Sequence, residues 1–272
     1  MKLKKIVFVF AVILFVSEHA RAIQKNKNTN DKDTLKVMSF NIRHCTNKDG
    51  KLNMQRTAEA ITHAGPNIVL LQEVDNKTGR SEGKDQAAEL GKLTGMEHVF
   101  GKAINFNGGE YGVAVLSKFP IVKSKNILLP YKQGTEQRTA LWVALKVGKD
   151  TLTVVTTHLE SGREAIDFET RLLQVKDIKE QILAHPHPVI LGGDLNSHPD
   201  FPGFLFLKSF MKPSDKEPYT PTYPGIDPWV KIDYILMYKP ERFTVLDYEV
   251  VDNELVSDHR PIISTLLLKE VK

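Results

Sequence analysis

The feature of this chain that most constrains its fold is a series of short apolar runs that each end in polar residues. The run 189–195 reads VILGGDL and leads directly into Asn196 and Ser197. The run 67–74 reads NIVLLQEV and places Glu73 in the same kind of position. Runs of this length, rich in Val, Ile and Leu, are typical of strands that are covered on both faces. We therefore expect polar side chains to gather where the strands end.

Other strand-like runs, separated by helical segments, extend this pattern along the chain. Further strands are expected over residues 35–43, 110–118, 139–147, 150–160, 230–237, 242–251 and 261–268. Helices are expected over residues 53–64, 84–94 and about 163–184. Asn53 is the candidate cap of the first helix, and Gly65-Pro66 is its stop signal. Strands punctuated by few helices predict an α/β fold with mixed sheets, in one domain.

The N-terminus has the composition of a secretory signal peptide. Residues 6–16 form an unbroken apolar run behind a lysine-rich start, and residues 20–22 (Ala-Arg-Ala) have the form of a cleavage site. This run is too short for a membrane span of about 20 residues. We predict a signal peptide at 1–22, a flexible leader at 23–34 and a folded domain at 35–270. Export to the periplasm or the medium follows from this prediction, and an uncleaved anchor is the alternative.

The charge of the mature chain limits its partners. The whole sequence has a formal charge of +4, and removal of four Lys/Arg and one Glu with the signal peptide takes away a net +3, which leaves +1. Tight nucleic-acid binders usually show a strong basic excess, so this charge counts against such a role. Cys45 is the single cysteine, which excludes an internal disulfide and makes a buried structural thiol the expectation.

The polar residues at the strand ends are chemically alike. They are Asn41, Glu73, His158, Asp194, Asn196, Asp233, Asp258 and His259. If they converge, several carboxylates share one cleft, where repulsion and burial are costly. A divalent cation relieves that cost, and oxygen ligands favour Mg²⁺, with Mn²⁺ as the alternative. A zinc centre would need a His/Cys cluster at ligand spacing, which the sequence lacks. Such a rim is suited to phosphoester hydrolysis.

Seven motifs follow one another in an order that resembles the endonuclease/exonuclease/phosphatase superfamily. They are SFNIR, LQEVD, YGVAVLS, THLE, GGDLNS, KIDYIL and SDHRP, and they extend from about Leu35 to Leu268. That group includes apurinic endonucleases, pancreatic-type deoxyribonucleases, neutral sphingomyelinases and inositol-polyphosphate 5-phosphatases. The resemblance implies a four-layer α/β sandwich, in which two packed mixed sheets are flanked by helices. It also implies a metal-dependent phosphoric ester hydrolase, here an exported member.

The resemblance assigns the catalytic roles residue by residue. Asp194 matches the acid that orients and deprotonates the attacking water. Asn196 matches the residue that binds the phosphoryl group and positions this acid. His259 matches the histidine that contacts a phosphate oxygen, and Asp233 matches the carboxylate that orients it. His158 resembles a second histidine found in the deoxyribonuclease and phosphatase branches.

The resemblance also assigns residues that bind metal and substrate. Glu73 matches the main metal ligand, Asn41 a residue that supports the metal or its water, and Asp258 a second acid on the metal side. Tyr111 resembles a tyrosine that touches phosphate in apurinic endonucleases.

Four further residues lie in polar or irregular stretches. Arg80 and Arg138 are expected either to clamp substrate phosphate or to form structural ion pairs. Trp229 is expected to pack within its loop, and a stacking platform for a base or lipid is the alternative. Lys231 stands where the family commonly has Arg, whose bidentate phosphate contact a lysine does not reproduce.

The predicted function is phosphodiester hydrolysis by an Asp-activated water with Mg²⁺ and a His/Asn phosphate-binding set. The alternatives are a phosphomonoesterase of the inositol-phosphate type and a catalytically silent binding protein, which would show an eroded acid set. The substrate is expected to be a nucleic acid, a phospholipid headgroup or a sugar or inositol phosphate, and the near-neutral charge favours a non-nuclease. A monomer without a stable protein partner is expected.

Overall fold

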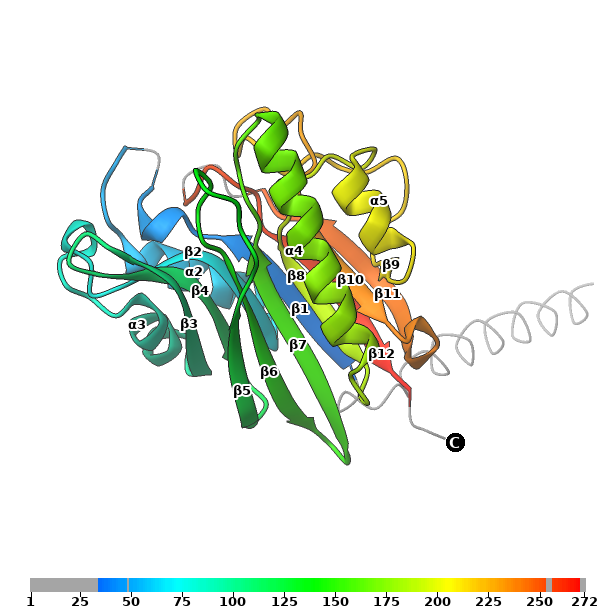
Figure 1. The fold of residues 1–272 in the computed structure, drawn as a ribbon. Coiled ribbons are helices and arrows are strands. Elements are labelled where there is room, and N and C mark those ends of the chain that lie inside the picture. Colours follow the sequence, from blue (N-terminus) through cyan, green and yellow to red (C-terminus); the bar gives the residue numbers. More distant parts are fainter. Residues whose placement is uncertain (1–33, 48, 253–255, 270–272) are drawn as a thin grey trace, which may run out of the picture. The chain divides into compact units, whose positions relative to one another are not determined.

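Two six-stranded mixed sheets form the centre of the fold (Figure 1). The computed structural model describes residues 34–47, 49–252 and 256–269. The first sheet has the order β11-β12-β1-β2-β4-β3 and the second the order β5-β6-β7-β8-β10-β9. The strands of the first sheet are β1 (Thr34–Asn41), β2 (Ile68–Asn76), β3 (Glu97–Phe106), β4 (Gly109–Ser117), β11 (Phe243–Val250) and β12 (Ile262–Leu268). Those of the second are β5 (Ile121–Leu128), β6 (Thr139–Val147), β7 (Asp150–His158), β8 (Val189–Asp194), β9 (Lys212–Pro213) and β10 (Asp233–Tyr238).

Helices cover the outer faces of both sheets. Among the described residues these are α2 (Met54–Ala64), α3 (Gln86–Thr94), α4 (Ala165–Leu183) and α5 (Pro202–Lys208). Asn53 caps α2 as predicted, because its side chain accepts a hydrogen bond from the backbone of Arg56 and Gly65 ends the helix in a left-handed conformation. No helix in the described part of the chain is long and apolar enough to cross a membrane.

Three apolar cores separate the layers. Leu70 and Leu141 belong to the core between the two sheets. Ile61 of α2 packs with the outer face of the first sheet, and Ile178 of α4 and Phe204 of α5 pack with the outer face of the second. Burial of each such side chain contributes about 1.5–3 kcal/mol. The predicted four-layer α/β sandwich is confirmed.

The boundaries of the predicted domains fall partly outside the described residues. The predicted signal peptide at 1–22 lies outside them, as do residues 23–33 of the predicted leader. The chain divides at Thr34, and the unit from Leu35 onward carries the elements given above. The domain boundaries therefore stay predictions.

Some elements differ from the sequence-based expectation. The strands β3 and β5 and the short helix α5 were not predicted, because β3 and β5 lack a continuous apolar pattern and most side chains of β5 are exposed. The strand predicted at 230–237 begins only at Asp233. Asp233 is therefore the first residue of its strand and does not lie within it.

Strand register brings polar residues together at one edge. His158 is the last residue of β7 and Asp194 the last of β8, while Asp233 opens β10. Asp194 is the register partner of both His158 and Asp233. In the first sheet, Asn41 at the end of β1 pairs with the residue that precedes Glu73. Because neighbouring strands are about 4.8 Å apart, register partners within each sheet are in contact range. A hydrogen bond of 3.2 Å from Asn41 to Asp194 joins the two sheets at this edge.

The two glycines before Asp194 allow this close approach. A Cβ atom on Gly193 would lie 2.0 Å from the carbonyl oxygen of Thr157 in β7, and one on Gly192 would lie 2.5 Å from Cδ1 of Leu70 in the other sheet. The sheets are also joined beneath the site, where Nε2 of Gln72 donates to Oγ1 of Thr156 at 3.0 Å. The GGD motif is thus needed for strand and sheet packing as well as for its acid.

Candidate active site

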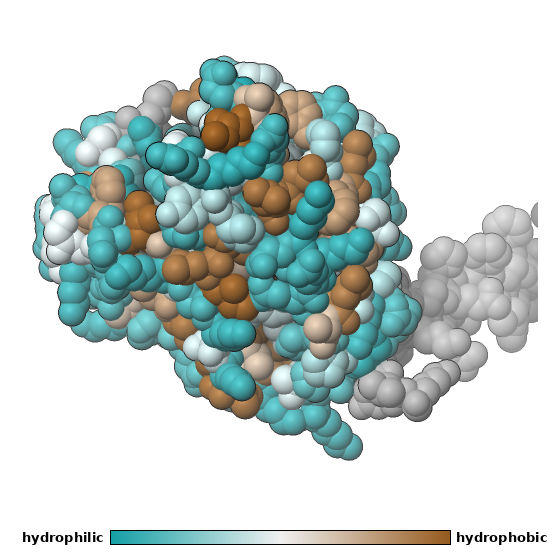
Figure 2. All heavy atoms as spheres, viewed as in Figure 1, coloured by the Kyte–Doolittle hydropathy of each residue, from teal (hydrophilic) through white to brown (hydrophobic). Residues whose placement is uncertain are grey.

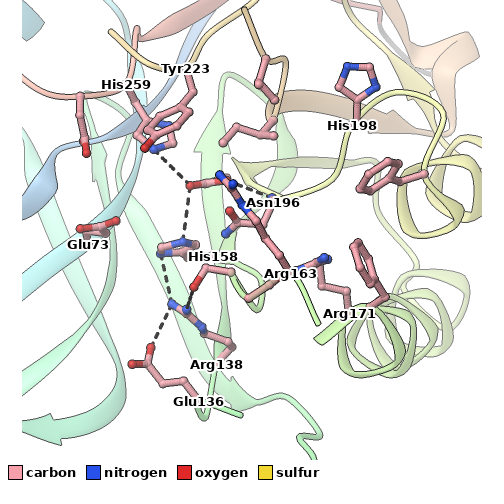
Figure 3. Close-up of a pocket in the computed structure, with 18 of the residues that line it drawn as sticks. Glu73, Glu136, Arg138, His158, Arg163, Arg171, Asn196, His198, Tyr223 and His259 are labelled. Carbon is pink, nitrogen blue, oxygen red and sulfur yellow. Dashed lines mark hydrogen bonds and ion pairs between the residues drawn. The ribbon is translucent and has the colours of Figure 1, made fainter. Parts of the chain in front are cut away.

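A pocket of about 610 Å³ opens at the edge where the polar strand ends meet (Figure 3). Its lining includes most of the predicted site residues, namely Glu73, Tyr111, Arg138, His158, Asp194, Asn196, Asp258 and His259. Asn41 and Asp233 are buried and contact the lining residues. The structure therefore brings together the catalytic and metal-binding residues that the sequence predicted.

Asp194 is the centre of this hydrogen-bond network. Its Oδ2 lies 3.4 Å from Nε2 of His158 and 3.6 Å from Nε2 of His259. The same oxygen accepts from Nδ2 of Asn41 at 3.2 Å, and Oδ1 accepts from the backbone N–H of Asn196 at 3.0 Å. Burial raises the pKa of Asp194 to about 7, against the lowering effect of His259. A carboxylate with a pKa near neutrality is suited to accept a proton from water.

His259 is held by an ion pair behind the pocket. Its Nδ1 lies 3.0 Å from Oδ2 of Asp233, and its ring packs against Tyr223 with centroids 4.8 Å apart. Burial alone would lower the pKa of His259, but Asp233 and Asp194 together raise it to about 10. His259 therefore carries protons on both ring nitrogens at neutral pH, with Nδ1–H directed at Asp233. Ser257 fixes the loop, because its hydroxyl donates to the carbonyl of Asn41 at 2.7 Å.

His158 has the opposite protonation state. Burial and the nearby Arg138 guanidinium hold the pKa of His158 well below its usual range, so the ring is neutral. Nη1 of Arg138 lies 3.4 Å from Nδ1 of His158. Because a guanidinium only donates hydrogen bonds, Nδ1 is the acceptor and the ring proton is on Nε2, facing Asp194. Arg138 thereby sets the tautomer of this histidine.

Arg138 is itself held by acids. It forms ion pairs with Glu136 at 3.0 Å and with Glu160 at 4.0 Å, and Nη2 donates to the hydroxyl of Ser161 at 3.2 Å. The structure thus gives Arg138 the predicted structural ion pairs together with a place in the pocket lining. Its prediction as a substrate-binding residue stays a prediction.

Glu73 faces the pocket from a bulge. The register of β2 against β4 shifts between Gln72 and Val74, and Glu73 has a φ of 55°. A left-handed conformation costs a non-glycine residue about 1–3 kcal/mol and is concentrated at functional sites. Oε1 of Glu73 accepts from Nδ2 of Asn41 at 3.0 Å. The sequence indicated the end of a strand here, but β2 continues beyond the bulge to Asn76.

No arginine or lysine of the described residues forms an ion pair with Glu73. Burial raises the pKa of Glu73, and the only basic group in ion-pair range among the described residues is Nδ1 of His44 at 3.9 Å. Burial and Arg80 lower the pKa of His44 to about 4, so this ring is neutral. Asp258, which also lines the pocket, lies 3.7 Å from the half-exposed Arg43. Glu73, Asp258 and Asn41 therefore fit a divalent cation.

A second group could hold a metal ion. Asp194, Asp233 and His259 are buried, and each offers a ligand atom within 4.8 Å of the others. This group already neutralises much of its own charge through the His259–Asp233 ion pair. Glu73 has no charged partner of this kind, whereas Asp258 is near Arg43, so Glu73 is the better candidate for a first metal ligand.

Arg80 is held away from the pocket. Its Nε and Nη2 donate to the buried Asp75 at 2.7 and 2.8 Å, and its guanidinium lies 4.5 Å from the centre of the Phe106 ring. Arg80 is not among the lining residues. Of the two predictions for Arg80, the structure shows the ion pair. Tyr111 does line the pocket, and burial raises its pKa well above the usual range, so its hydroxyl stays protonated.

Three other predictions have clear outcomes. Trp229 is 69% exposed at the pocket, so the expectation that it packs within its loop was wrong. Nζ of Lys231 pairs with Oδ2 of Asp215 at 3.1 Å in the interior, which leaves it no role as a phosphate contact. Cys45 is buried as predicted, and burial raises the pKa of its thiol to about 12.

Sequence reasoning missed the wall of the pocket that comes from outside the motifs. This wall contains Arg163, which precedes α4, and Phe168 and Arg171, which belong to α4. It also contains Phe201, which precedes α5. Tyr223 covers His259 from the loop that precedes β10. No motif marks these residues, because the loops that carry them acquire their position only through the packing of α4 and α5 on the second sheet.

The α/β sandwich, with a buried acid and histidine cluster at one edge of its sheets, defines a phosphoesterase fold. A family model described as Endonuclease/Exonuclease/phosphatase family matches residues 38–259. This match covers most of the chain, which therefore belongs to the endonuclease/exonuclease/phosphatase family.

Individual relatives are more distant. Sphingomyelinase C from Bacillus cereus is 27% identical over 222 residues, which cover 72% of this chain and 66% of that protein. The alignment thus spans a little less than two thirds of that relative. An endonuclease/exonuclease/phosphatase from Beutenbergia cavernae DSM 12333 has a TM-score of 0.74 at 23% identity, over 87% of this chain and 72% of that one. Mannosyl-6-phosphatase Bt3783 from Bacteroides thetaiotaomicron VPI-5482 has a TM-score of 0.70 at 18% identity, over 86% and 100%. The two structures show a shared fold.

Proposed function

We propose that this protein hydrolyses phosphodiesters with the help of a divalent cation, Mg²⁺ or alternatively Mn²⁺. The observation that carries the proposal is the position of Asp194. This buried carboxylate has a pKa of about 7 and lies between two histidine Nε2 atoms at 3.4 and 3.6 Å. The site therefore combines a proton acceptor with two donors in one pocket, as water attack on a phosphoryl group requires.

Each side chain has a task in this reaction. Asp194 orients a water molecule and accepts its proton as the oxygen attacks phosphorus. The bond from phosphorus to the leaving ester oxygen breaks, and that oxygen departs with the bonding electrons and is protonated by solvent. The Nε2–H groups of His158 and His259 donate to phosphoryl oxygens, and the positive charge on His259 stabilises the charge that develops there. Asn196 is fixed by its donation to the carbonyl of Leu159 at 3.0 Å, with its remaining polar atoms available to substrate. When bound near Glu73, the cation would supply further charge neutralisation.

Two comparisons bear on the kind of ester. Sphingomyelin, the substrate named for the Bacillus cereus relative, is a phosphodiester, whereas the substrate named for mannosyl-6-phosphatase is a monoester. The first relative is detected by sequence at 27% identity and the second by fold at 18%. We therefore propose diesters and keep monoesters as the alternative.

A colorimetric assay tests this function. Bis(p-nitrophenyl) phosphate and p-nitrophenyl phosphate are supplied with Mg²⁺, Mn²⁺ or EDTA, to wild type and to the variant Asp194→Ala. We expect cation-dependent release of nitrophenol from the diester, with a loss of at least about 10³-fold in the variant. The variant Asp200→Asn changes a 75%-exposed acid nearby and should retain activity. Turnover that survives in Asp194→Ala would exclude this residue as the base, and absence of any turnover would favour a binding protein.

A substrate panel narrows the class further. Plasmid DNA, RNA, sphingomyelin and inositol phosphates are compared at equal concentration with and without EDTA. Nicking of plasmid alone would establish a nuclease, and turnover of monoesters alone would overturn the preference for diesters.

We also propose that the protein is exported. The proposal rests on the lysine-rich start, the apolar run 6–16 and the Ala-Arg-Ala sequence at 20–22. Expression of the full chain in a bacterial host, followed by fractionation and N-terminal sequencing, should give a mature chain that begins at Ile23. An N-terminus at Met1 in the cytoplasmic fraction would contradict export.

A further inference from the structure

One wall of the pocket is aromatic and lies apart from the acids. Phe168 of α4 and Phe201, which precedes α5, both line the pocket and pack edge to face, with ring centroids 5.5 Å apart at 71°. Their side chains are 39% and 36% exposed. In Figure 3, Arg163, Arg171 and His198 lie on the side of the pocket away from Glu73. Apolar rings that stay accessible inside a pocket are binding surfaces for a ligand.

A buried arginine holds this wall in place. Nη1 of Arg171 donates to the carbonyl oxygens of Glu160 and Gly162 at 2.6 and 2.9 Å, and its guanidinium lies 4.6 Å from the centre of the Phe168 ring. Arg171 is only 3% exposed. Because two backbone hydrogen bonds fix the guanidinium of Arg171 and this group covers one face of Phe168, this side of the wall is ordered before any ligand binds.

A second arginine of the pocket carries a positive charge that has no ion-pair partner among the described residues. Arg163 lines the pocket, and Figure 3 shows its side chain extending toward Asn196. Among the described residues it forms neither a hydrogen bond nor an ion pair in this structure, unlike Arg138 and Arg171. The aromatic wall is therefore accompanied by one exposed and one buried positive charge.

Building on the proposed function, we infer that Phe168, Phe201 and Arg163 form a subsite for an organic substituent of the scissile phosphate. The substituent it fits carries a ring or another flat apolar group and is neutral or anionic. Phe168 and Phe201 supply the contact area, and Arg163 supplies a donor for an oxygen of the phosphate or the substituent.

The same residues argue against a quaternary ammonium substituent such as choline. Aromatic rings can bind such cations through their faces. Here Arg171 already covers a face of Phe168, and Arg163 brings a second positive charge to the same wall. A cationic substituent would therefore find one ring face occupied and would be repelled by Arg163, while the charge of Arg171 is partly balanced by Asp167 and Glu160.

Exposed apolar side chains also occur outside the pocket, but they do not extend its aromatic wall. Ile166 and Leu205 are exposed nearby but do not line it. On the face seen in Figure 2, apolar side chains are interspersed among polar ones and do not form one continuous surface. This distribution favours recognition of a single substituent over adsorption to an extended apolar surface.

Three substrates with one leaving group test the subsite. Each is a phosphodiester that carries one p-nitrophenyl group, and its second substituent is phenyl, methyl or choline. Hydrolysis releases p-nitrophenol from all three. We expect wild type to show a KM for the phenyl ester about tenfold below that for the methyl ester, and the lowest kcat/KM for the choline ester. In Phe201→Ala, which leaves the Arg171–Phe168 contact intact, the KM for the phenyl ester should rise about tenfold with little change in kcat. Leu205→Ala is the matched control for loss of an exposed apolar side chain and should leave both values unchanged.

Reversal of the charge at Arg163 tests whether the subsite rejects a cationic substituent. Arg163→Glu should raise kcat/KM for the choline ester relative to the methyl ester by about tenfold. A phenyl preference that persists in Phe201→Ala, or a choline ester that wild type prefers, would overturn the subsite.

A binding measurement separates this inference from the proposed function. Calorimetric titration with diphenyl and dimethyl phosphate requires no turnover. Tighter binding of diphenyl phosphate that is lost in Phe201→Ala would support the subsite even if none of the esters were hydrolysed. Equal binding of the two compounds by wild type would refute it even if hydrolysis were observed.

Discussion

Nδ1 of His259 lies 3.0 Å from Oδ2 of Asp233, and both residues are almost fully buried. The other ring nitrogen of His259 is 3.6 Å from Asp194. Asp233 therefore stabilises the protonated ring from behind, while Nε2–H remains directed toward the reacting groups. This relation makes Asp233 a positioning residue whose effect is exerted through His259.

Replacement of this carboxylate should reduce activity without loss of the fold. In Asp233→Asn the histidine loses the negative charge that raises its pKa, so kcat should fall on the order of 10²–10⁴-fold. The high-pH limb of the rate profile should move to lower pH, which a purely structural role would not cause. Steady-state kinetics across pH measure both effects. Asp247→Asn, at an exposed acid of β11, is the control, and an unshifted limb in Asp233→Asn would contradict the role.

The pH dependence of wild type follows from the two coupled groups. The active form has Asp194 deprotonated and His259 protonated, so kcat/KM should fall as pH drops below about 7 and again as pH rises above about 10. The two limbs belong to the coupled pair. Measurement at limiting and at saturating Mg²⁺ should show the low limb at lower pH when more of the cation is bound, because positive charge favours the carboxylate. A flat profile between pH 5 and 8 at limiting Mg²⁺ would be inconsistent with Asp194 as the base.

Cation binding should depend on the acids around Glu73. Glu73→Gln removes a charged ligand, and Asn41→Ala removes the donor that contacts both Glu73 and Asp194. We expect the Mg²⁺ concentration for half-maximal activity to rise about 10–100-fold in Asn41→Ala, and further in Glu73→Gln. Calorimetric titration with Mn²⁺ gives the affinity independently of turnover. If the affinity for Mn²⁺ is unchanged in Glu73→Gln, the cation binds at the group formed by Asp194, Asp233 and His259 and not at Glu73.

The Arg80–Asp75 pair should contribute to stability. Burial raises the pKa of Asp75, but hydrogen bonds from Arg80, Ser81 and Thr78 outweigh this and lower it overall. Arg80→Ala removes the cation that balances the buried carboxylate, which keeps its hydrogen bonds from Ser81 and Thr78, and should reduce the free energy of unfolding by about 3 kcal/mol, measured by urea denaturation. Lys123→Ala, at an exposed cation, should have little effect.

Acid titration checks the sign of this contribution. Because the folded pKa of Asp75 is depressed, its stabilisation is present above the unfolded pKa of about 3.9 and is lost as pH falls through the folded value. Asp75→Asn should therefore remove a part of the stability loss that wild type shows below about pH 4. If the free energy of unfolding falls equally steeply with decreasing pH in wild type and in Asp75→Asn, Asp75 does not make this contribution.

The backbone contact at Gly193 gives a packing prediction. In Gly193→Ala the added Cβ would lie 2.0 Å from the carbonyl oxygen of Thr157, so β7 and β8 must separate. We expect a loss of about 1–3 kcal/mol in the free energy of unfolding, together with reduced kcat, because His158 and Asp194 are carried by these strands. Gly148→Ala is the control at a turn away from the site, where nothing lies within 4 Å of an added Cβ but the φ of 55° strains alanine. It should lose stability and keep kcat, and an equal loss of kcat in both variants would contradict the role of Gly193.

The positions of many strands and helices could be predicted from the local pattern of the sequence. The strands β2, β6 and β8 each contain an apolar run, and α2 has both its cap and its stop signal, so their positions follow from sequence. Edge strands such as β5 are mostly exposed and carry little apolar signal. The bulge at Glu73 was not predicted either, because it depends on register against β4.

The sequence by itself determined which side chains are available for chemistry. Acids, amides and histidines follow apolar runs in an order that resembles one family, and the family match over residues 38–259 agrees with it. Tertiary structure decided how these side chains act. It placed Arg80 against Asp75, put the proton of His158 on Nε2 through Arg138, and set Phe168 and Phe201 beside the pocket. Local sequence could not reveal these relations, because each is a contact between segments joined only by sheet register and helix packing, where burial and neighbouring charge set the protonation of every group.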